Sequence, residues 1–173
     1  MSVKFAIGQD SHKFETDPEK LYSKPLILGG ICFGGMPCLS ANSDGDVVLH
    51  ALTNAVSGIT CRNILGKPAD DMCKRGITDS AEYLKLALKD LRDMHYKATH
   101  VSFTIEAAVP KFSPKIDEMR RNIEALLELP ENSCGITATT GEGLTAFGQG
   151  LGIMVFCVLT AEAAGSPADK TEL

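Results

Sequence analysis

The sequence contains no tryptophan, and aromatic residues make up only 6% of its 173 positions. It also lacks an excess of positive charge, because 17 lysines and arginines face 22 aspartates and glutamates, a formal net charge of -5. Both shortages argue against nucleic acid as a partner, since such surfaces need clustered cations and often stacking aromatics. No apolar run is long enough to cross a bilayer or to act as a secretion signal. We therefore expect no membrane partner and a cytoplasmic location.

Cysteine is present, but without a recognisable framework. The six cysteines include no C-x-x-C pair and no regular spacing, so neither disulfides nor a thiolate zinc site is predicted. With 44% hydrophobic and 23% charged residues, the composition predicts one globular domain over residues 1–164, followed by a disordered tail at 165–173.

The order of apolar patterns predicts the fold class. The expected elements are a strand at 3–8, a hairpin at 24–33, a helix at 47–57 ended by Gly58, a loop at 59–78, a helix at 79–95, a strand at 99–109, a helix at 113–129, and strands at 134–140 and 151–161. Ser43, three residues before Asp46, resembles a capping box for the first helix. This order is typical of an α+β protein with a single mixed sheet and helices packed on one face, ferredoxin-like in character.

A carboxylate and an imidazole stand two residues apart where the first strand ends. Side chains of an extended chain alternate between faces, so Asp10 and His12 are predicted to point the same way and could present two metal ligands. The competing interpretation is an ordinary polar strand end, with Asp10 in turn hydrogen bonds and His12 exposed.

A second histidine lies on the first predicted helix, one turn after Asp46. If that helix packs on the first strand, His50 could join Asp10 and His12, and one carboxylate with two imidazoles would hold zinc with an open fourth position. The alternative is a partly buried histidine that only satisfies its own hydrogen bonds.

The segment ATTGEGL, residues 138–144, combines hydroxyls at Thr139 and Thr140 with a glycine-rich turn and the carboxylate of Glu142. This mixture suits a phosphate together with a hard cation such as magnesium. An ordinary glycine-rich turn with a solvated Glu142 is the alternative.

Four segments in chain order closely resemble one family, the 2-C-methyl-D-erythritol 2,4-cyclodiphosphate synthases. They are DSH at 10–12, SDGDVVLHALT at 43–53, VPKF at 109–112 and ATTGEGL at 138–144. The resemblance implies a phosphorus-oxygen lyase of isoprenoid precursor biosynthesis in the methylerythritol phosphate pathway. Such an enzyme cyclises 4-diphosphocytidyl-2-C-methyl-D-erythritol 2-phosphate and releases CMP, as a homotrimer with active sites at the subunit interfaces.

The resemblance also implies metals and residue roles. It places one zinc ion per subunit on Asp10, His12 and His50, and magnesium or manganese with the substrate on Glu142. The implied catalytic residues are Asn42, Ser43, Thr140 and Glu142. The implied contacts to the cytidine diphosphate substrate are Asp10, His12, Asn42, Ser43, Asp70, Asp71, Ala107, Pro110, Lys111, Phe112, Thr139, Thr140 and Glu142, with residues 107–112 around the cytosine.

The chain differs from the family pattern at identifiable positions. Asn42 stands where the family usually has a histidine, so a donor remains but a titratable group is lost. Gln149 replaces an arginine that faces the threefold cavity of the family and can hold an isoprenoid diphosphate. Two other functions are therefore weighed: a catalytically impaired zinc-binding trimer that acts as an interaction protein, and a zinc phosphohydrolase.

Overall fold

The computed structural model describes residues 2–164, and the tail predicted at 165–173 lies outside them. In chain order its elements are β1 (Val3–Lys13), β2 (Ile27–Leu28), β3 (Ile31–Cys32), α1 (Val47–Thr60), α2 (Lys67–Lys74), α3 (Ser80–Asp93), β4 (Tyr96–Glu106), α4 (Ile116–Leu126), β5 (Cys134–Thr139), the 3-10 turn η1 (Gly141–Gly143) and β6 (Gly152–Ala163). Within the described residues, none of the helices has the length and hydropathy needed to cross a membrane.

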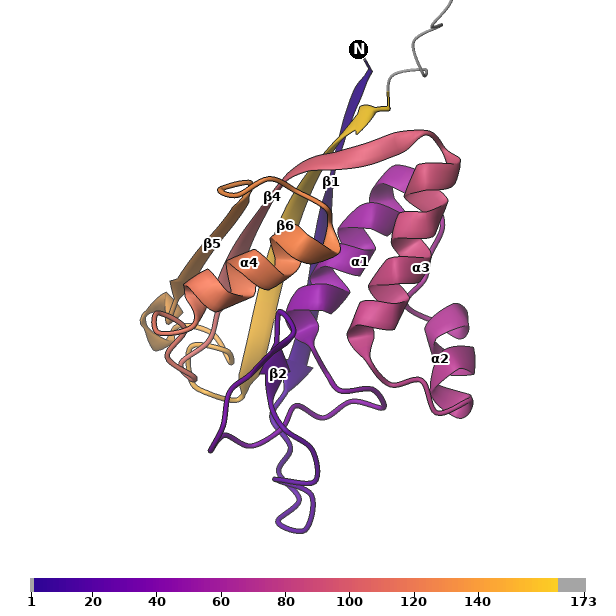
Figure 1. Cartoon of the computed structure of the whole chain (residues 1–173). Helices are drawn as coiled ribbons and strands as arrows, with labels where there is room; N and C mark the ends of the chain where they lie inside the picture. The colour runs from indigo at the N-terminus through magenta and orange to yellow at the C-terminus, as the bar shows by residue number, and fades with distance from the viewer. Residues whose placement is uncertain (1, 165–173) are drawn as a thin grey trace, which may run out of the picture.

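The main sheet has four strands in the order β1-β6-β4-β5. β6 runs antiparallel to both β1 and β4, whereas β4 and β5 are parallel, so the predicted mixed sheet is confirmed. Figure 1 shows α1, α3 and α4 on the same side of this sheet, as predicted. The chain order, with a hairpin before α1 and two strands after α4, differs from the β-α-β-β-α-β order of ferredoxin-like folds.

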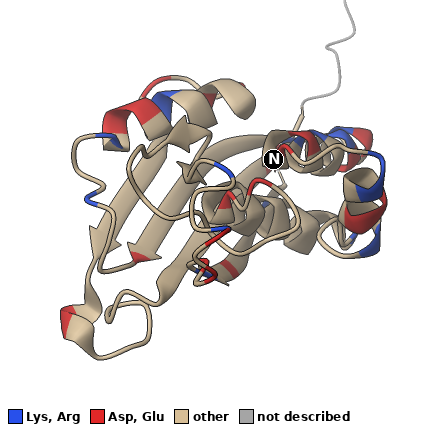
Figure 2. Ribbon diagram, turned by 90° about the horizontal axis from the view of Figure 1, so that it is seen from below, with Lys and Arg blue, Asp and Glu red and all other residues tan. Residues whose placement is uncertain are grey.

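One face of the sheet is buried by the helices, and the other is exposed. The alternation predicted for β4 is confirmed, because Val101, Phe103 and Ile105 are fully buried against the helices while the residues between them face outward. β6 is apolar on both faces, as expected of a central strand. On the face that no helix covers, Phe5 is 78% and Ile7 66% exposed. Figure 2 shows that charged residues gather on the helices and loops and leave the strands largely without charge.

The first helix begins and ends differently from the prediction. Its N-cap is Asp46, which accepts the N–H groups of Val48 and Leu49 at 3.1 and 3.0 Å, so the predicted capping role of Ser43 is wrong. The helix also continues past Gly58 to Thr60. Gly58 packs so tightly on β1 that an added Cβ would lie 2.9 Å from the Cβ of Ala6, so close packing rather than helix termination explains this glycine.

The loop predicted at 59–78 contains the helix α2. Pro68 stands in its first turn, where a missing N–H costs nothing, so it starts the helix rather than breaking it. Ala69 and Met72 are buried, and Lys67 pairs with Asp71 one turn later at 2.5 Å. Eight residues display too few turns for a helical period to be visible in the sequence.

Candidate functional site

The backbone of α1 comes very near to the sheet at Gly8, two residues before Asp10. A Cβ at position 8 would lie 2.1 Å from the carbonyl oxygen of Ala51 and 2.4 Å from the amide nitrogen of Ala55. Only a residue without a side chain lets the helix backbone lie this near to β1. Because Ala51 follows His50, this contact brings the histidine to the end of the strand.

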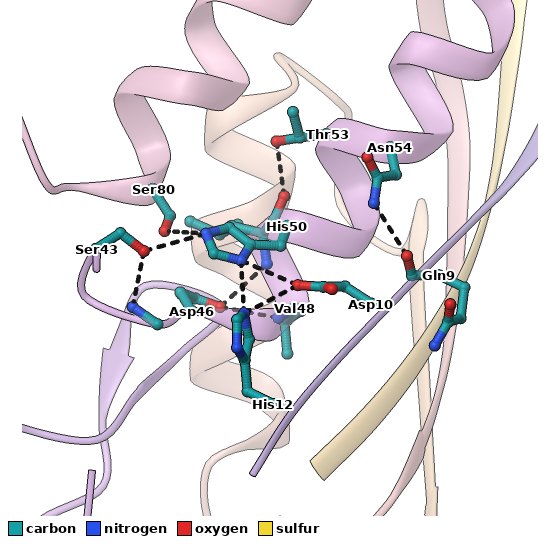
Figure 3. A network of polar contacts seen from close by, with 12 residues as sticks. Gln9, Asp10, His12, Ser43, Asp46, Val48, His50, Thr53, Asn54 and Ser80 are labelled. Carbon is teal, nitrogen blue, oxygen red and sulfur yellow. Dashed lines mark hydrogen bonds and ion pairs between the residues drawn. The ribbon is translucent and has the colours of Figure 1, made fainter. Parts of the chain in front are cut away.

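Three potential metal ligands meet there, as Figure 3 shows. Asp10 Oδ2 lies 3.0 Å from His50 Nδ1 and 3.1 Å from His12 Nε2, and the two ring nitrogens are 3.1 Å apart. The predicted alternation holds, because Asp10 and His12 pair with the inward-facing Val155 and Ile153 of β6 and so point toward the helices. The predicted convergence of the three residues is confirmed.

This donor set fits a divalent metal ion. Ligand atoms placed about 2.0 Å from a tetrahedral zinc lie about 3.3 Å apart, close to the three separations between Asp10, His12 and His50. Two imidazoles and one carboxylate are typical of catalytic zinc sites that keep a fourth position open. His50 is only 6% exposed, whereas Asp10 and His12 are partly exposed on the side of a cavity.

The charge on Asp10 is favoured by its neighbours. Burial acts to raise the pKa of this carboxyl, but hydrogen bonds and Coulomb attraction from His12 and His50 outweigh it and hold the pKa well below its usual range. Asp10 is therefore ionised at neutral pH, as a metal ligand must be.

A second layer of polar groups orients His50. Its Nε2 lies 2.8 Å from Ser80 Oγ and 3.4 Å from Ser43 Oγ. Ser80 in turn donates its hydroxyl and its backbone N–H, the latter at 3.0 Å, to the carboxylate of Asp44. This carboxylate-serine-histidine chain leaves Nδ1 free to face Asp10 and His12, which is the usual role of groups behind a metal-binding histidine.

Replacing Ser80 by alanine is expected to weaken metal binding by about 10- to 100-fold without unfolding the protein, because His50 loses its orienting partner. Competition with a chromogenic chelator measures this affinity. Ser57→Ala is the matched control, since the Ser57 hydroxyl is buried on α1 without a hydrogen-bond partner among the described residues. Equal metal affinity in the two variants would contradict the role of Ser80.

The metal-ligand cluster lines a cavity of about 970 Å³. Asn42, Ser43 and Asp70 also line it, as expected for residues predicted to contact substrate. Asp71, which was predicted to contact substrate together with Asp70, is not among the lining residues and pairs with Lys67 on α2.

The other predicted substrate residues form a second group, away from this cavity. They lie outside the cavity lining, in the segment after β4 or at and after the end of β5: Ala107, Pro110, Lys111, Phe112, Thr139, Thr140 and Glu142. Ala107 and Phe112 are 5% exposed, whereas Thr139, Thr140 and Glu142 are exposed. Thr139 Oγ1 accepts the N–H of Gly141 at 3.0 Å and so supports the turn. One subunit does not bring the two groups together in a single cavity.

Several site residues escaped the sequence analysis. The missed residues are Ser80, Asp44 and Lys24. Ser80 bonds Asp44 from 36 positions away, and Lys24 bonds the carbonyl of Ala41, 17 positions later, at 2.7 Å. The only local signal was the SDGD motif, which includes Asp44 but does not reveal its partner.

Comparison with known proteins identifies relatives of the whole domain. The model of the YgbB family matches residues 3–162. A 2-C-methyl-D-erythritol 2,4-cyclodiphosphate synthase of Chlamydia caviae is 50% identical over 155 residues, which cover 89% of this chain and 86% of the relative. The protein of the same name from Chlamydia trachomatis serovar L2b is also 50% identical, over 89% of this chain and 85% of its own.

Solved structures agree with this assignment. A 2C-methyl-D-erythritol 2,4-cyclodiphosphate synthase of Plasmodium vivax has a TM-score of 0.76 at 28% identity, covering 94% of this chain and 99% of that one. A synthase solved in its CDP-bound form has a TM-score of 0.79 at 26% identity, covering 92% and 100%. The bifunctional IspDF of Campylobacter jejuni has a TM-score of 0.82 at 29% identity, and this chain covers only 42% of its length.

Proposed function

The chain belongs to the YgbB family, and from this membership and its site we infer that it catalyses the reaction of its synthase relatives. It is an enzyme that converts 4-diphosphocytidyl-2-C-methyl-D-erythritol 2-phosphate to 2-C-methyl-D-erythritol 2,4-cyclodiphosphate and CMP. An oxygen of the 2-phosphate forms a bond to the β-phosphorus, and the bond from that phosphorus to the oxygen it shares with CMP breaks. Because nucleophile and electrophile belong to one molecule, holding it in a folded conformation does much of the work.

The observation that carries the proposal is the convergence of Asp10, His12 and His50 beside a cavity that Asn42 and Ser43 also line. All three ligands, Ser43 and the polar cavity wall are present, so a trimer without activity is not favoured. A phosphohydrolase is not favoured either, because the similarity to synthases covers nearly nine tenths of the chain.

The residues of the first group would bind the erythritol end of the substrate. Asn42 and Ser43 would hold the attacking 2-phosphate, and Asp70 would approach the sugar hydroxyls from α2. In the second group, Thr139 and Thr140 would contact the diphosphate. The segment from Ala107 to Phe112 would surround the cytosine, chiefly through its backbone, since Ala107 and Phe112 are buried.

Asp10, His12 and His50 would hold zinc, and Glu142 would hold magnesium or manganese together with the substrate. Bound there, the cations would neutralise phosphate charge, which lowers the cost of one anion approaching another. The protein itself would contribute by keeping Asp10 ionised, by holding Nδ1 of His50 toward the ion, and by leaving Glu142 exposed in its turn.

Replacing Glu142 by glutamine is expected to raise the magnesium concentration needed for half-maximal turnover by about tenfold or more, while zinc content stays unchanged, because a neutral amide binds hard cations weakly. A magnesium titration of the rate measures this. Glu131→Gln is the control, since Glu131 is an exposed carboxylate in another turn. A titration curve that coincides with that of the parent protein would remove Glu142 from the magnesium site.

We propose that three copies of this single domain assemble around the uncovered face of the sheet. Ile7 pairs across the strands with Val158, and Gln9 with Phe156, so exposed apolar side chains lie together on that face. Charged groups are scarce there, which is typical of the centre of an obligate interface. Assembly would also let the first group of one subunit meet the second group of its neighbour.

The function is tested by phosphorus NMR of the purified protein with the cytidylyl substrate, zinc and magnesium. We expect two coupled signals from the cyclic diphosphate together with the signal of CMP. Linear phosphorylated products would instead indicate hydrolysis, and an unaltered substrate in the presence of zinc-loaded protein would refute the synthase activity.

A further inference from the structure

A lysine from outside the recognised motifs reaches into the cavity beside the metal-ligand cluster. Lys24 lies in the segment between β1 and β2, and its half-buried side chain lines the cavity. Its Nζ donates to the carbonyl oxygen of Ala41 at 2.7 Å and also to that of Ser43. These two residues flank Asn42, so the ammonium fixes the short loop that carries Asn42 and Ser43.

The ammonium of Lys24 has capacity for one more partner. A lysine has three N–H donors, and the two carbonyls of Ala41 and Ser43 use two of them. Within residues 2–164, Lys24 makes no ion pair with a carboxylate, whereas Lys20, the other lysine of the cavity wall, pairs with Asp17 at 3.2 Å. Burial lowers the pKa of Lys24, while the nearby carboxylates of Asp44 and Glu15 act against this.

The positive charge of Lys24 would help this cavity to bind a phosphate. Its wall includes the carboxylates of Asp10, Glu15, Asp44 and Asp70, and Asn42 is neutral. A phosphate placed against Asn42 and Ser43 would meet repulsion from these acids, which a metal ion at the ligand cluster and the ammonium of Lys24 would both offset. Ser43 connects the two parts of the site, since its carbonyl binds Lys24 and its hydroxyl lies 3.4 Å from His50 Nε2.

We propose that Lys24 is a substrate-binding residue whose third N–H donates to the phosphate ester held at Asn42 and Ser43, and which keeps that loop in place. The inference rests on the proposed function and adds a cation to it that the motifs do not contain. A direct, charge-assisted hydrogen bond from the ammonium to the phosphate would fix the position of the phosphate relative to the metal ligands.

The test compares Lys24→Met and Lys24→Arg with Lys20→Met as the matched control, all as zinc-loaded protein. We expect Lys24→Met to lower kcat/KM for the cytidylyl substrate by about 10- to 100-fold. The inhibition constant of CDP, which lacks the erythritol phosphate, should change by less than about twofold, and zinc content should not change. Lys24→Arg should recover part of the loss, and Lys20→Met should resemble the parent protein.

Two results would overturn the inference. One is an unchanged kcat/KM in Lys24→Met; the other is a parallel loss of CDP affinity or zinc, which would mean that Lys24 only supports the fold. Failure of the proposed function is recognised separately, because the parent protein would then show no turnover. In that case the role of Lys24 is tested by calorimetric measurement of binding affinity. The parent protein must bind the cytidylyl substrate more tightly than CDP, and Lys24→Met must abolish this difference in affinity.

Discussion

Replacing His50 by alanine is expected to lower zinc content and turnover together, the latter by more than about 100-fold, while the fold persists. Removing a direct ligand should exceed the 10- to 100-fold cost typical of groups behind the ligands. His50 is buried, but its ring nitrogens face polar groups, the other two ligands on one side and Ser80 on the other, so its loss removes mainly polar contacts. Elemental analysis, circular dichroism and the NMR assay measure the three quantities.

A histidine far from the site provides the control for His50→Ala. His95 is exposed and lies just after the C-terminal end of α3, whereas Ser80 is at the N-terminal end of that helix. The positive φ of His95, 59°, is one that asparagine tolerates. His95→Asn should keep both zinc and turnover. Zinc retained in full by His50→Ala would show that the cluster is not the metal site, even if turnover were lost.

Replacing Ile7 by lysine is expected to abolish assembly and to lower turnover by about 100-fold or more, yet to leave zinc bound. Ile7 is 66% exposed in one subunit and lies opposite Val158 on the uncovered face of the sheet. Burying an unpaired ammonium there costs about 3–5 kcal/mol per copy, which an interface of three equivalent contacts cannot absorb. Turnover falls because the two groups of substrate residues lie apart in one subunit.

Sedimentation velocity, zinc content and the NMR assay distinguish this outcome from the loss of a ligand. His50→Ala should remain assembled without zinc, whereas Ile7→Lys should be a zinc-binding single subunit. Ala125→Lys on the exposed side of α4 is the control, since it adds the same charge where the helix faces solvent. An assembled Ile7→Lys protein, or an active single subunit, would contradict the proposed location of the interface.

Some of the site could be predicted because it depends on local geometry. Strand alternation alone places Asp10 and His12 on one face, and helical spacing alone places His50 one turn from the N-cap. The error at α2 has the opposite cause. Its buried apolar residues are Ala69 and Met72, with Cys73 partly buried beside them, so burial against the rest of the protein, and not an internal period, stabilises it.

The partners of His50 could not be predicted in the same way. Ser80 lies 30 positions from His50, and Lys24 lies 19 positions before Ser43, so nothing in the spacing of these residues indicates a contact. Gly8 reads as an ordinary strand glycine until the backbone of α1 is seen to occupy the space of its missing side chain. Each of these contacts depends on how elements pack, which local sequence does not specify.

The sequence by itself determined the α+β class, the shared face of Asp10 and His12, and the family to which the motifs belong, because side-chain periodicity and motif spacing are properties of the chain. Only the tertiary structure decided that α1 approaches β1 closely enough for His50 to complete the ligand set, that Ser80 and Asp44 stand behind His50, and that Lys24 holds the loop beside it. The physical reason is that these polar groups satisfy one another across a packed interface between distant segments.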